Sequence, residues 1–233
     1  MLKLVIALSK RNKLTYIHPL EKIFMTILPI IIMGFIYNPM VIFGNIMIFF
    51  LMHIIIKNNM KIVANFAFKI AAFAAFSSLT FIFDYGLKYV YVIILKCLFS
   101  GLSLSFFTLT TPIEHILYYF SKNKWLTDIC DIAKSMERFL MILDDEYNIM
   151  HNAMKSRGGF DGFSSKIKST GKIAALLFVN TMERWKNIKD GLDSRCYRGY
   201  TPYIAIDFNF SYKRFIFICI YNFILIFLAI YLK

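Results

Sequence analysis

Long apolar runs flanked by charged residues constrain the fold of this chain more than any other feature of its sequence. A helix needs about 20 apolar residues to cross the hydrocarbon core of a membrane. Hydrophobic residues make up 58% of the 233 residues, which is more than an ordinary soluble domain contains. The runs predict an all-α integral membrane protein with five transmembrane helices, near residues 23–37, 40–56, 62–83, 89–110 and 215–232.

The N-terminal part of this pattern is the least regular. The first expected span is short and contains Pro29, and Asn38-Pro39 then turns the chain directly into the second span. Residues 1–8 are apolar but too few to cross a membrane. Their basic cluster follows them, which is the reverse of the order in a secretory signal. We therefore expect an interfacial anchor at this end.

The distribution of Lys and Arg predicts how the spans are oriented. The chain has 27 basic and 14 acidic residues, and 16 of the basic ones lie within residues 113–214. The first 22 residues and the loop 57–61 are basic as well, and cytoplasmic loops are enriched in Lys and Arg. We therefore expect a plasma-membrane protein with a cytoplasmic N-terminus and an extracytoplasmic C-terminus at Lys233. The basic excess favours anionic lipid over nucleic acid as its partner.

Residues 113–200 differ in kind from the rest of the chain. They contain 11 of the 14 acidic residues and no long uncharged run, so we expect a cytoplasmic helical domain inserted between the fourth and fifth spans. The chain is thereby divided into a membrane part at 1–112, the insert at 113–200, and a linker with the last span at 201–233. The segment Thr111-Pro112-Ile113-Glu114 predicts a capping box at the first helix of the insert.

Two longer helices are expected inside the insert, one starting near Thr127 and one after Ser165. Each carries apolar residues three and four positions apart, which form one stripe along a helix. The first stripe consists of Ile129, Ile132, Met136, Phe139, Leu143, Tyr147, Met150 and Met154, and the second of Phe178, Met182, Trp185, Ile188 and Leu192. Such stripes need a partner surface, either a membrane interface, a neighbouring helix or another subunit.

The ends of these two helices resemble each other. One ends in Ser156-Arg157-Gly158 and the other in Ser194-Arg195-Cys196. The simplest interpretation is two ordinary C-caps, because Arg complements the negative end of a helix dipole and Gly adopts the left-handed cap conformation. The repetition within one insert favours a shared binding role instead, although the residue types alone do not say what is bound.

With these motifs the sequence resembles the transmembrane T component of energy-coupling factor (ECF) transporters, the CbiQ/EcfT family. The resemblance covers nearly the whole chain, and the family pattern is Ala-Arg-Gly, or a close variant, at the ends of two coupling helices. Cys196 departs from the Gly of that pattern, as in a variant associated with CbiQ-like members. Three further segments carry the resemblance: Ile17-His18-Pro19-Leu20-Glu21-Lys22, Thr110-Thr111-Pro112 and Glu137-Arg138.

The resemblance implies a coupling subunit with no catalytic residues, no metal site and no cofactor of its own. It implies two cytoplasmic ABC-type ATPase subunits as partners, which bind ATP and Mg, and a substrate-binding membrane protein, the S component. Arg157 and Arg195 are each implied to enter a groove on one ATPase. Likeness to CbiQ-like members implies uptake of cobalt or nickel.

Three alternatives remain open on the sequence. The first is the shared T component of a vitamin ECF transporter, and the second is a conventional ABC permease subunit, which would normally show one coupling loop. The third is an intramembrane enzyme, for which no Ser/His, Asp/Asp or HExxH constellation is visible at membrane depth. A phosphate-binding Gly-Lys-Ser loop is also absent from the sequence, so ATP hydrolysis needs a separate subunit.

The remaining polar residues have ordinary interpretations. The histidines lack metal-ligand spacing and the cysteines contain no CxxC pair; they are His18, His53, His115, His151, Cys97, Cys130, Cys196 and Cys219. Lys69 and Lys96 lie within expected spans, where charge indicates function by default, yet each is close enough to a boundary to reach water. Asp144-Asp145-Glu146 is interpreted as the solvated face of a helix.

Overall fold

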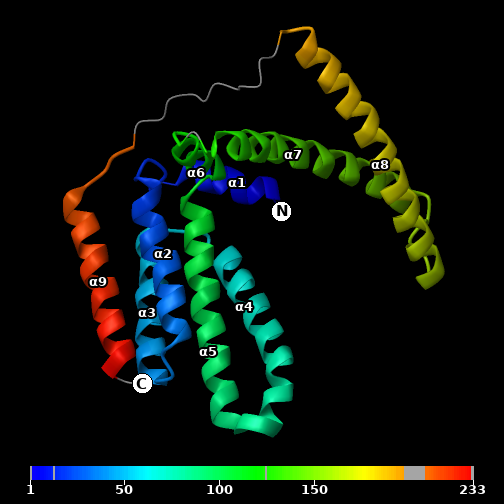
Figure 1. Cartoon of the computed structure of the whole chain (residues 1–233). Coiled ribbons are helices and arrows are strands. Elements are labelled where there is room, and N and C mark those ends of the chain that lie inside the picture. Colours follow the sequence, from blue (N-terminus) through cyan, green and yellow to red (C-terminus); the bar gives the residue numbers. More distant parts are fainter. Residues whose placement is uncertain (1, 13, 124, 197–207, 232–233) are drawn as a thin grey trace. The chain divides into compact units, whose positions relative to one another are not determined.

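The computed structural model describes residues 2–12, 14–123, 125–196 and 208–231. Apart from one isolated β-bridge, the regular structure in these residues is helical, with nine α-helices and one 3₁₀ turn (Figure 1). The chain divides into two compact units, the first formed by 1–116 and 206–233 and the second by 117–205. The expected all-α class is confirmed, and each unit is described by itself.

The first unit contains the apolar helices. They are α1 (Leu2–Arg11), α2 (Pro19–Gly34), α3 (Pro39–Ile55), α4 (Met60–Ser77), α5 (Phe81–Thr110) and α9 (Tyr212–Tyr231). A 3₁₀ turn, Ser78–Thr80, joins α4 to α5. Pro is the first residue of both α2 and α3, where its missing N–H is harmless. The residues before them, His18 and Asn38, accept hydrogen bonds from the next free backbone N–H.

In the described part of the chain, three helical segments are long and apolar enough to cross a membrane: Met60–Phe83, Tyr85–Thr110 and Tyr212–Tyr231. The α3 helix is apolar but has 17 residues, and α2 has 16 residues with Pro29 inside. The boundary expected between the spans 62–83 and 89–110 agrees with the structure, where one candidate span ends at Phe83 and the next begins at Tyr85. Helix continues on both sides, and the backbone breaks only at Gly86, whose φ of 78° is in the region that glycine tolerates best.

The core of the first unit lies where α2, α3 and α5 meet. Phe49 of α3 is fully buried and meets Phe99 and Phe106 of α5 edge to face, with ring centroids 5.4 Å and 6.0 Å apart. The α5 helix also packs against α4, and α2 packs against α9 (Figure 1). Gly101 makes the α4–α5 contact close, since a Cβ there would lie 3.2 Å from the Ala67 Cα.

The N-terminal helix α1 is amphipathic, as expected for an interfacial segment. Val5 and Leu8 pack against the core cluster of the first unit, and α1 contacts α5. Lys10, on the outer side, donates a hydrogen bond to Glu114 Oε1 at 2.9 Å. Glu114 was expected to close a capping box with Thr111, and its observed partner is this lysine instead.

The second unit contains the two long amphipathic helices. Helix α6 (Ile113–Phe120) begins in the first unit and ends in the second, which continues with α7 (Thr127–Ser156) and α8 (Phe163–Asp193). The expected start of α7 at Thr127 is confirmed. The expected start of α8 after Ser165 is too late, because the left-handed Gly162, with φ of 89°, ends the preceding turn and lets the helix begin at Phe163.

Candidate functional site

The end of α7 is a compact cap built on Ser156-Arg157-Gly158. The Ser156 hydroxyl donates to the Asn152 carbonyl at 2.6 Å. The Arg157 N–H donates to the Met154 carbonyl at 3.2 Å, so the last turn tightens before the helix stops. Gly158 follows with φ of 69°, the left-handed conformation of a helix terminator. The Arg157 side chain is exposed.

The end of α8 repeats this geometry. The Ser194 hydroxyl donates to the Asp190 carbonyl at 2.7 Å, and the Arg195 N–H donates to the Leu192 carbonyl at 3.1 Å. Cys196 takes the position of Gly158 and has φ of 53°. The similarity of the two ends therefore extends from sequence to hydroxyl, backbone and cap.

Cys196 is one of two non-glycine residues with positive φ among the described residues. The left-handed conformation brings a Cβ close to the following carbonyl and disfavours every residue except glycine, with asparagine and aspartate as partial exceptions. The substitution of Cys for Gly thus keeps the backbone shape of the first cap at an energetic cost. The thiol is free and exposed, immediately beside Arg195.

The turn after Arg157 is held against the first turns of α8. The Gly159 carbonyl accepts hydrogen bonds from the Ser165 hydroxyl at 2.9 Å and from the Ser169 hydroxyl at 2.5 Å. A Cβ on Gly159 would lie 2.9 Å from the Met154 carbonyl oxygen. This oxygen belongs to the backbone and cannot move aside as a flexible side chain could. Arg157 is therefore presented by a fixed helix hairpin.

An ion pair joins α7 to α8 away from this turn. Glu146 of α7 pairs with Arg184 of α8, and the Glu146 side chain is only 16% exposed. The interpretation of Glu146 as part of a solvated face was wrong, because its partner comes from the neighbouring helix. Glu146 precedes Arg157 by as many residues as Arg184 precedes Arg195, so the pair ties the two motif-bearing arms together.

The two arginine motifs are far apart. Gly159, beside the first motif, contacts Ser169 near the start of α8, whereas Arg195 follows the last turn of the same helix. From Ser169 to Arg195 a helix rising 1.5 Å per residue covers about 40 Å. The structure therefore brings the three residues of each motif together but keeps the two motifs at separate ends of α8 (Figure 1).

Much of the apolar surface of α7 and α8 is exposed. The most exposed members of the expected stripes are Ile129 at 62%, Ile132 at 61%, Met136 at 59%, Phe178 at 64% and Trp185 at 58%. Large exposed apolar faces of this kind mark contact with another protein or a membrane.

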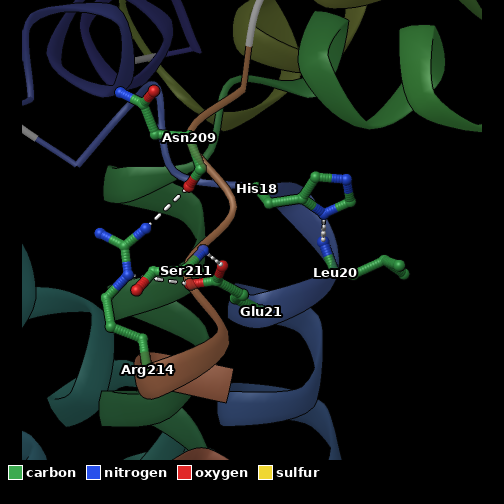
Figure 2. A network of polar contacts seen from close by, with 6 residues as sticks. All are labelled: His18, Leu20, Glu21, Asn209, Ser211 and Arg214. Carbon is green, nitrogen blue, oxygen red and sulfur yellow. Dashed lines mark hydrogen bonds and ion pairs between the residues drawn. The ribbon is translucent and has the colours of Figure 1, made fainter.

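A second polar site lies in the first unit, where α2 begins and α9 is about to begin (Figure 2). The Glu21 side chain is 3% exposed. Its Oε1 accepts a hydrogen bond from the Ser211 N–H at 3.0 Å, and its Oε2 lies 3.2 Å from Arg214 Nε. Arg214 also donates to the Asn209 carbonyl at 2.7 Å. One buried carboxylate therefore fastens the start of α9 to the first turn of α2.

Lys22, the next residue, is also buried and reaches different partners. Its Nζ donates to the Thr110 carbonyl at 2.7 Å, at the end of α5, and to the Thr15 carbonyl at 3.5 Å. His115 of α6 donates from Nδ1 to the same Thr15 carbonyl at 3.2 Å. Burial is the largest cause that lowers the pKa of His115 from its ordinary value of 6.5, which favours the neutral ring.

Glu21 and Lys22 each fasten a segment of the first unit that is close in sequence to its border with the second unit. Lys22 donates a hydrogen bond to Thr110, the last residue of α5, and α6 begins three residues later. Glu21 binds the segment that precedes α9, where the chain returns. We name this pair of contacts, made from one turn of α2, the α2 joint.

Other charged and polar residues serve the packing of the first unit. Lys96 donates to the Gly34 carbonyl at 2.8 Å and lies 4.0 Å from the ring centroid of Tyr37, so it caps α2. His53 is fully buried, with Nε2 3.1 Å from the Leu102 carbonyl oxygen. Lys69 is exposed on α4. The four cysteines are free thiols.

A sequence profile described as CbiQ, cobalt transport protein, matches residues 6–204, a stretch that includes both arginine motifs and most of the first unit. The chain belongs to the CbiQ family. Membership identifies it as a membrane component of a cobalt transport protein family, a family that is generally non-catalytic.

Two curated relatives share part of this CbiQ-family chain. An uncharacterized protein of Methanocaldococcus jannaschii is 33% identical over 127 residues, which are 54% of this chain and 47% of that protein. A protein of Methanocorpusculum labreanum named as a fused cobalt transport protein, CbiMQ, is 30% identical over 114 residues, which are 49% of this chain and 19% of that protein. The matched stretch is less than half the length of each relative.

Sequence reasoning missed the α2 joint of this CbiQ-family protein. Glu21 and Lys22 were visible as part of the segment that carries the family resemblance, yet no role followed from them. The available signal was physical: two adjacent charges in the first turn of an apolar helix must be exposed at its end or paired inside it. Their partners, Ser211 and Thr110, are distant in sequence.

Proposed function

We propose that this chain is the coupling subunit of an ECF-type importer, which transmits ATP hydrolysis by partner ATPases to a substrate-binding membrane protein. The observation that carries the proposal is the repeated Ser-Arg-left-handed end of α7 and α8. Two plain C-caps would not need the same hydroxyl contact, the same backbone turn and, at Cys196, a conformation that costs energy.

The spacing of the arginines supports two separate ATPase subunits as partners. About 40 Å of helix exceeds the diameter of a small domain, about 30 Å, so one groove would not take both side chains. Arg suits such a groove because its planar guanidinium forms two parallel hydrogen bonds with a carboxylate and stays charged at any physiological pH. ATP and Mg belong to the ATPases, and this chain carries out no catalytic step itself.

The exposed apolar faces of α7 and α8 are proposed to contact the S component and to move with the ATPases. A rigid hairpin, pinned by Gly159 and by the pair Glu146–Arg184, transmits displacement better than a flexible loop. The relative named as a CbiMQ fusion supports an association with a CbiM-type membrane component, since fused chains are held together.

The α2 joint is proposed to pass this movement into the membrane helices. Displacement of the second unit reaches the first through the chain at α6 and at the segment before α9. Lys22 and Glu21 hold those two connections on one helical turn, so both connections pull on α2 together. Without the joint, each connection could move without moving α2.

The proposed arrangement in the membrane has five spans, with α2 and α3 added to the three long segments. The basic ends of α1 and α3 lie beside the end of α5, since Arg11, Lys57 and Leu109 line one cavity, and the positive-inside bias assigns this side to the cytoplasm of the plasma membrane. A reporter fused near Lys166 should read cytoplasmic and one fused after Lys233 extracytoplasmic. Readings on the same side would contradict five spans.

Cobalt is the proposed substrate, with nickel second, because the family description and the fused relative both name cobalt transport. The ion-selecting groups are proposed to lie on the S component rather than on this chain. The dedicated system is favoured over a shared vitamin transporter for the same reason.

The test replaces each motif arginine in the assembled transporter. Arg157→Ala and Arg195→Ala should each weaken recovery of the ATPases with the tagged chain and abolish uptake, because removing one partner of a buried charged pair costs about 2–5 kcal/mol. Lys155→Ala, which removes a charge from the same last turn of α7, is the matched control and should leave both readouts unchanged. Full ATPase recovery and uptake in the double arginine variant would refute the coupling role.

A further inference from the structure

A small cavity opens in the first unit between the end of α1, the α3–α4 loop and the end of α5. Its volume is about 310 Å³, and its lining consists of Leu8, Arg11, Asn12, Ile56, Lys57, Asn58, Asn59 and Leu109. This is at the lower end of the range of ligand sites, about 300–1,000 Å³. Neither the arginine motifs nor the α2 joint contributes a residue to it.

The lining combines two cations with no carboxylate. Neither Arg11 nor Lys57 forms an ion pair within the described part of the chain. The nearby Lys10 is different, since it pairs with Glu114 and does not line the cavity. Two uncompensated positive charges at one cavity attract an anion.

The polar floor of the cavity is already ordered. The Asn12 amide donates to Asn58 Oδ1 at 2.9 Å and to the Leu109 carbonyl at 3.2 Å. The Asn58 amide in turn lies 3.0 Å from His53 Nδ1. These side chains satisfy one another, so they shape the cavity and leave Arg11 and Lys57 as the groups that face a ligand.

Lys57 occupies a position where glycine is the usual residue. Its φ is 58°, and the Asn58 N–H donates to the His53 carbonyl at 3.1 Å, which is the hydrogen bond of a glycine-type helix terminator. Lysine is unfavourable in this left-handed conformation, because its Cβ lies close to the following carbonyl oxygen. Its side chain is therefore better explained by a role outside the turn than by the turn itself.

The cavity lies beside the ends of two candidate membrane spans. Asn59 directly precedes the candidate span Met60–Phe83, and Leu109 is next to the end of the candidate span Tyr85–Thr110. Leu8 and Ile56 add apolar surface to the same lining. A phosphate group held by Arg11 and Lys57 would thus sit where lipid headgroups are, with apolar surface beside it.

We propose that this cavity binds the phosphodiester headgroup of an anionic phospholipid, with Arg11 and Lys57 as its ligands. Basic pockets between membrane helices are typical binding places for acidic headgroups. A bound lipid would join α1, α3, α4 and α5 at their ends and fix the interfacial helix α1 to the bundle. This inference does not depend on the ATPase contacts.

The test uses the purified full chain in nanodiscs that contain equal parts of phosphatidylglycerol and phosphatidylcholine. Native mass spectrometry after release should find phosphatidylglycerol retained over phosphatidylcholine. Arg11→Gln and Lys57→Gly should each reduce that retention about tenfold, the effect of losing one hydrogen bond between charged groups. Lys57→Gly removes the charge and eases the backbone, so misfolding does not explain its loss.

Lys61→Gln is the matched control, because Lys61 is an exposed cation four residues along the chain from Lys57 that does not line the cavity. It should retain phosphatidylglycerol like the wild type. An equal loss in Lys61→Gln, or equal retention of both lipids by the wild type, would overturn the proposal. Thermal stabilisation by inorganic phosphate, lost in Arg11→Gln, without preference for phosphatidylglycerol would identify a soluble phosphate compound as the ligand and also overturn it.

Discussion

The substitution Glu21→Gln should weaken the α2 joint, because it replaces one carboxylate oxygen by an amide group. The Glu21 carboxylate is nearly inaccessible to water and accepts from the Ser211 N–H at 3.0 Å while pairing with Arg214 at 3.2 Å. Glutamine keeps the acceptor for Ser211 but loses the charge. A hydrogen bond to a charged group contributes about 1.5–3 kcal/mol, and the Arg214 side chain is 44% exposed, so solvent weakens its share. We expect a loss of about 1–2 kcal/mol.

The functional expectation is more specific than the loss of stability. Glu21 is in the first unit, so Glu21→Gln should still recover the ATPases through the intact motifs Arg157 and Arg195. ATP hydrolysis should continue in proteoliposomes, while uptake per ATP hydrolysed falls severalfold because α9 no longer follows α2. Thermal unfolding in detergent measures the stability, and paired uptake and phosphate-release assays measure the coupling.

The adjacent Lys213 provides the control for this prediction. It is exposed and forms no ion pair among the described residues, so Lys213→Gln removes one charge at the same helix start without removing a hydrogen bond of the joint. It should match the wild type in both assays. Wild-type uptake per ATP in Glu21→Gln would refute the reasoning, as would ATPase loss in that variant.

Three further predictions concern single sites. Cys196→Gly should raise the free energy of unfolding by about 1 kcal/mol, since glycine adopts φ of 53° without strain, and an unchanged or lowered midpoint would contradict the cap. Gly101→Val should destabilise by about 1–3 kcal/mol through overpacking against Ala67, whereas Gly44→Ala, with open space, should not. His115 has a lowered pKa, so the unfolded chain binds its proton first and stability should fall as pH drops below about 6.5; His115→Asn should flatten that part of the profile.

Local patterns in the sequence predicted the helices well because their causes are local. The apolar run expected at 40–56 corresponds to α3 within one residue at each end, and the glycine after Arg157 marks the end of α7. The first expected span, 23–37, was displaced, because α2 begins at Pro19 and ends at Gly34. The second cap was harder, because Cys196 is not a residue from which a left-handed conformation is expected. Only the repeated Ser-Arg pattern pointed to it.

Long-range contacts could not be predicted in the same way. Ser211 is 190 residues from Glu21, and nothing in the sequence around either residue indicates that they form a hydrogen bond. The same holds for Glu146, which resembled a solvated acid until α8 placed Arg184 beside it. Likewise the sequence placed the boundary between two spans near residues 84–88, but it did not identify Gly86 as the single non-helical residue there. Pairing and backbone strain depend on tertiary packing, which one sequence does not encode visibly.

The most direct test of the coupling account uses the native thiol beside Arg195. Cys196 is exposed and free, so a short maleimide–succinimide cross-linker attached there should capture a lysine of an ATPase subunit in the assembled transporter. The account predicts a cross-linked product of this chain with an ATPase, identified by mass spectrometry and absent in Cys196→Ser. An assembled, transport-active complex in which Cys196 is labelled but never linked to an ATPase would contradict it.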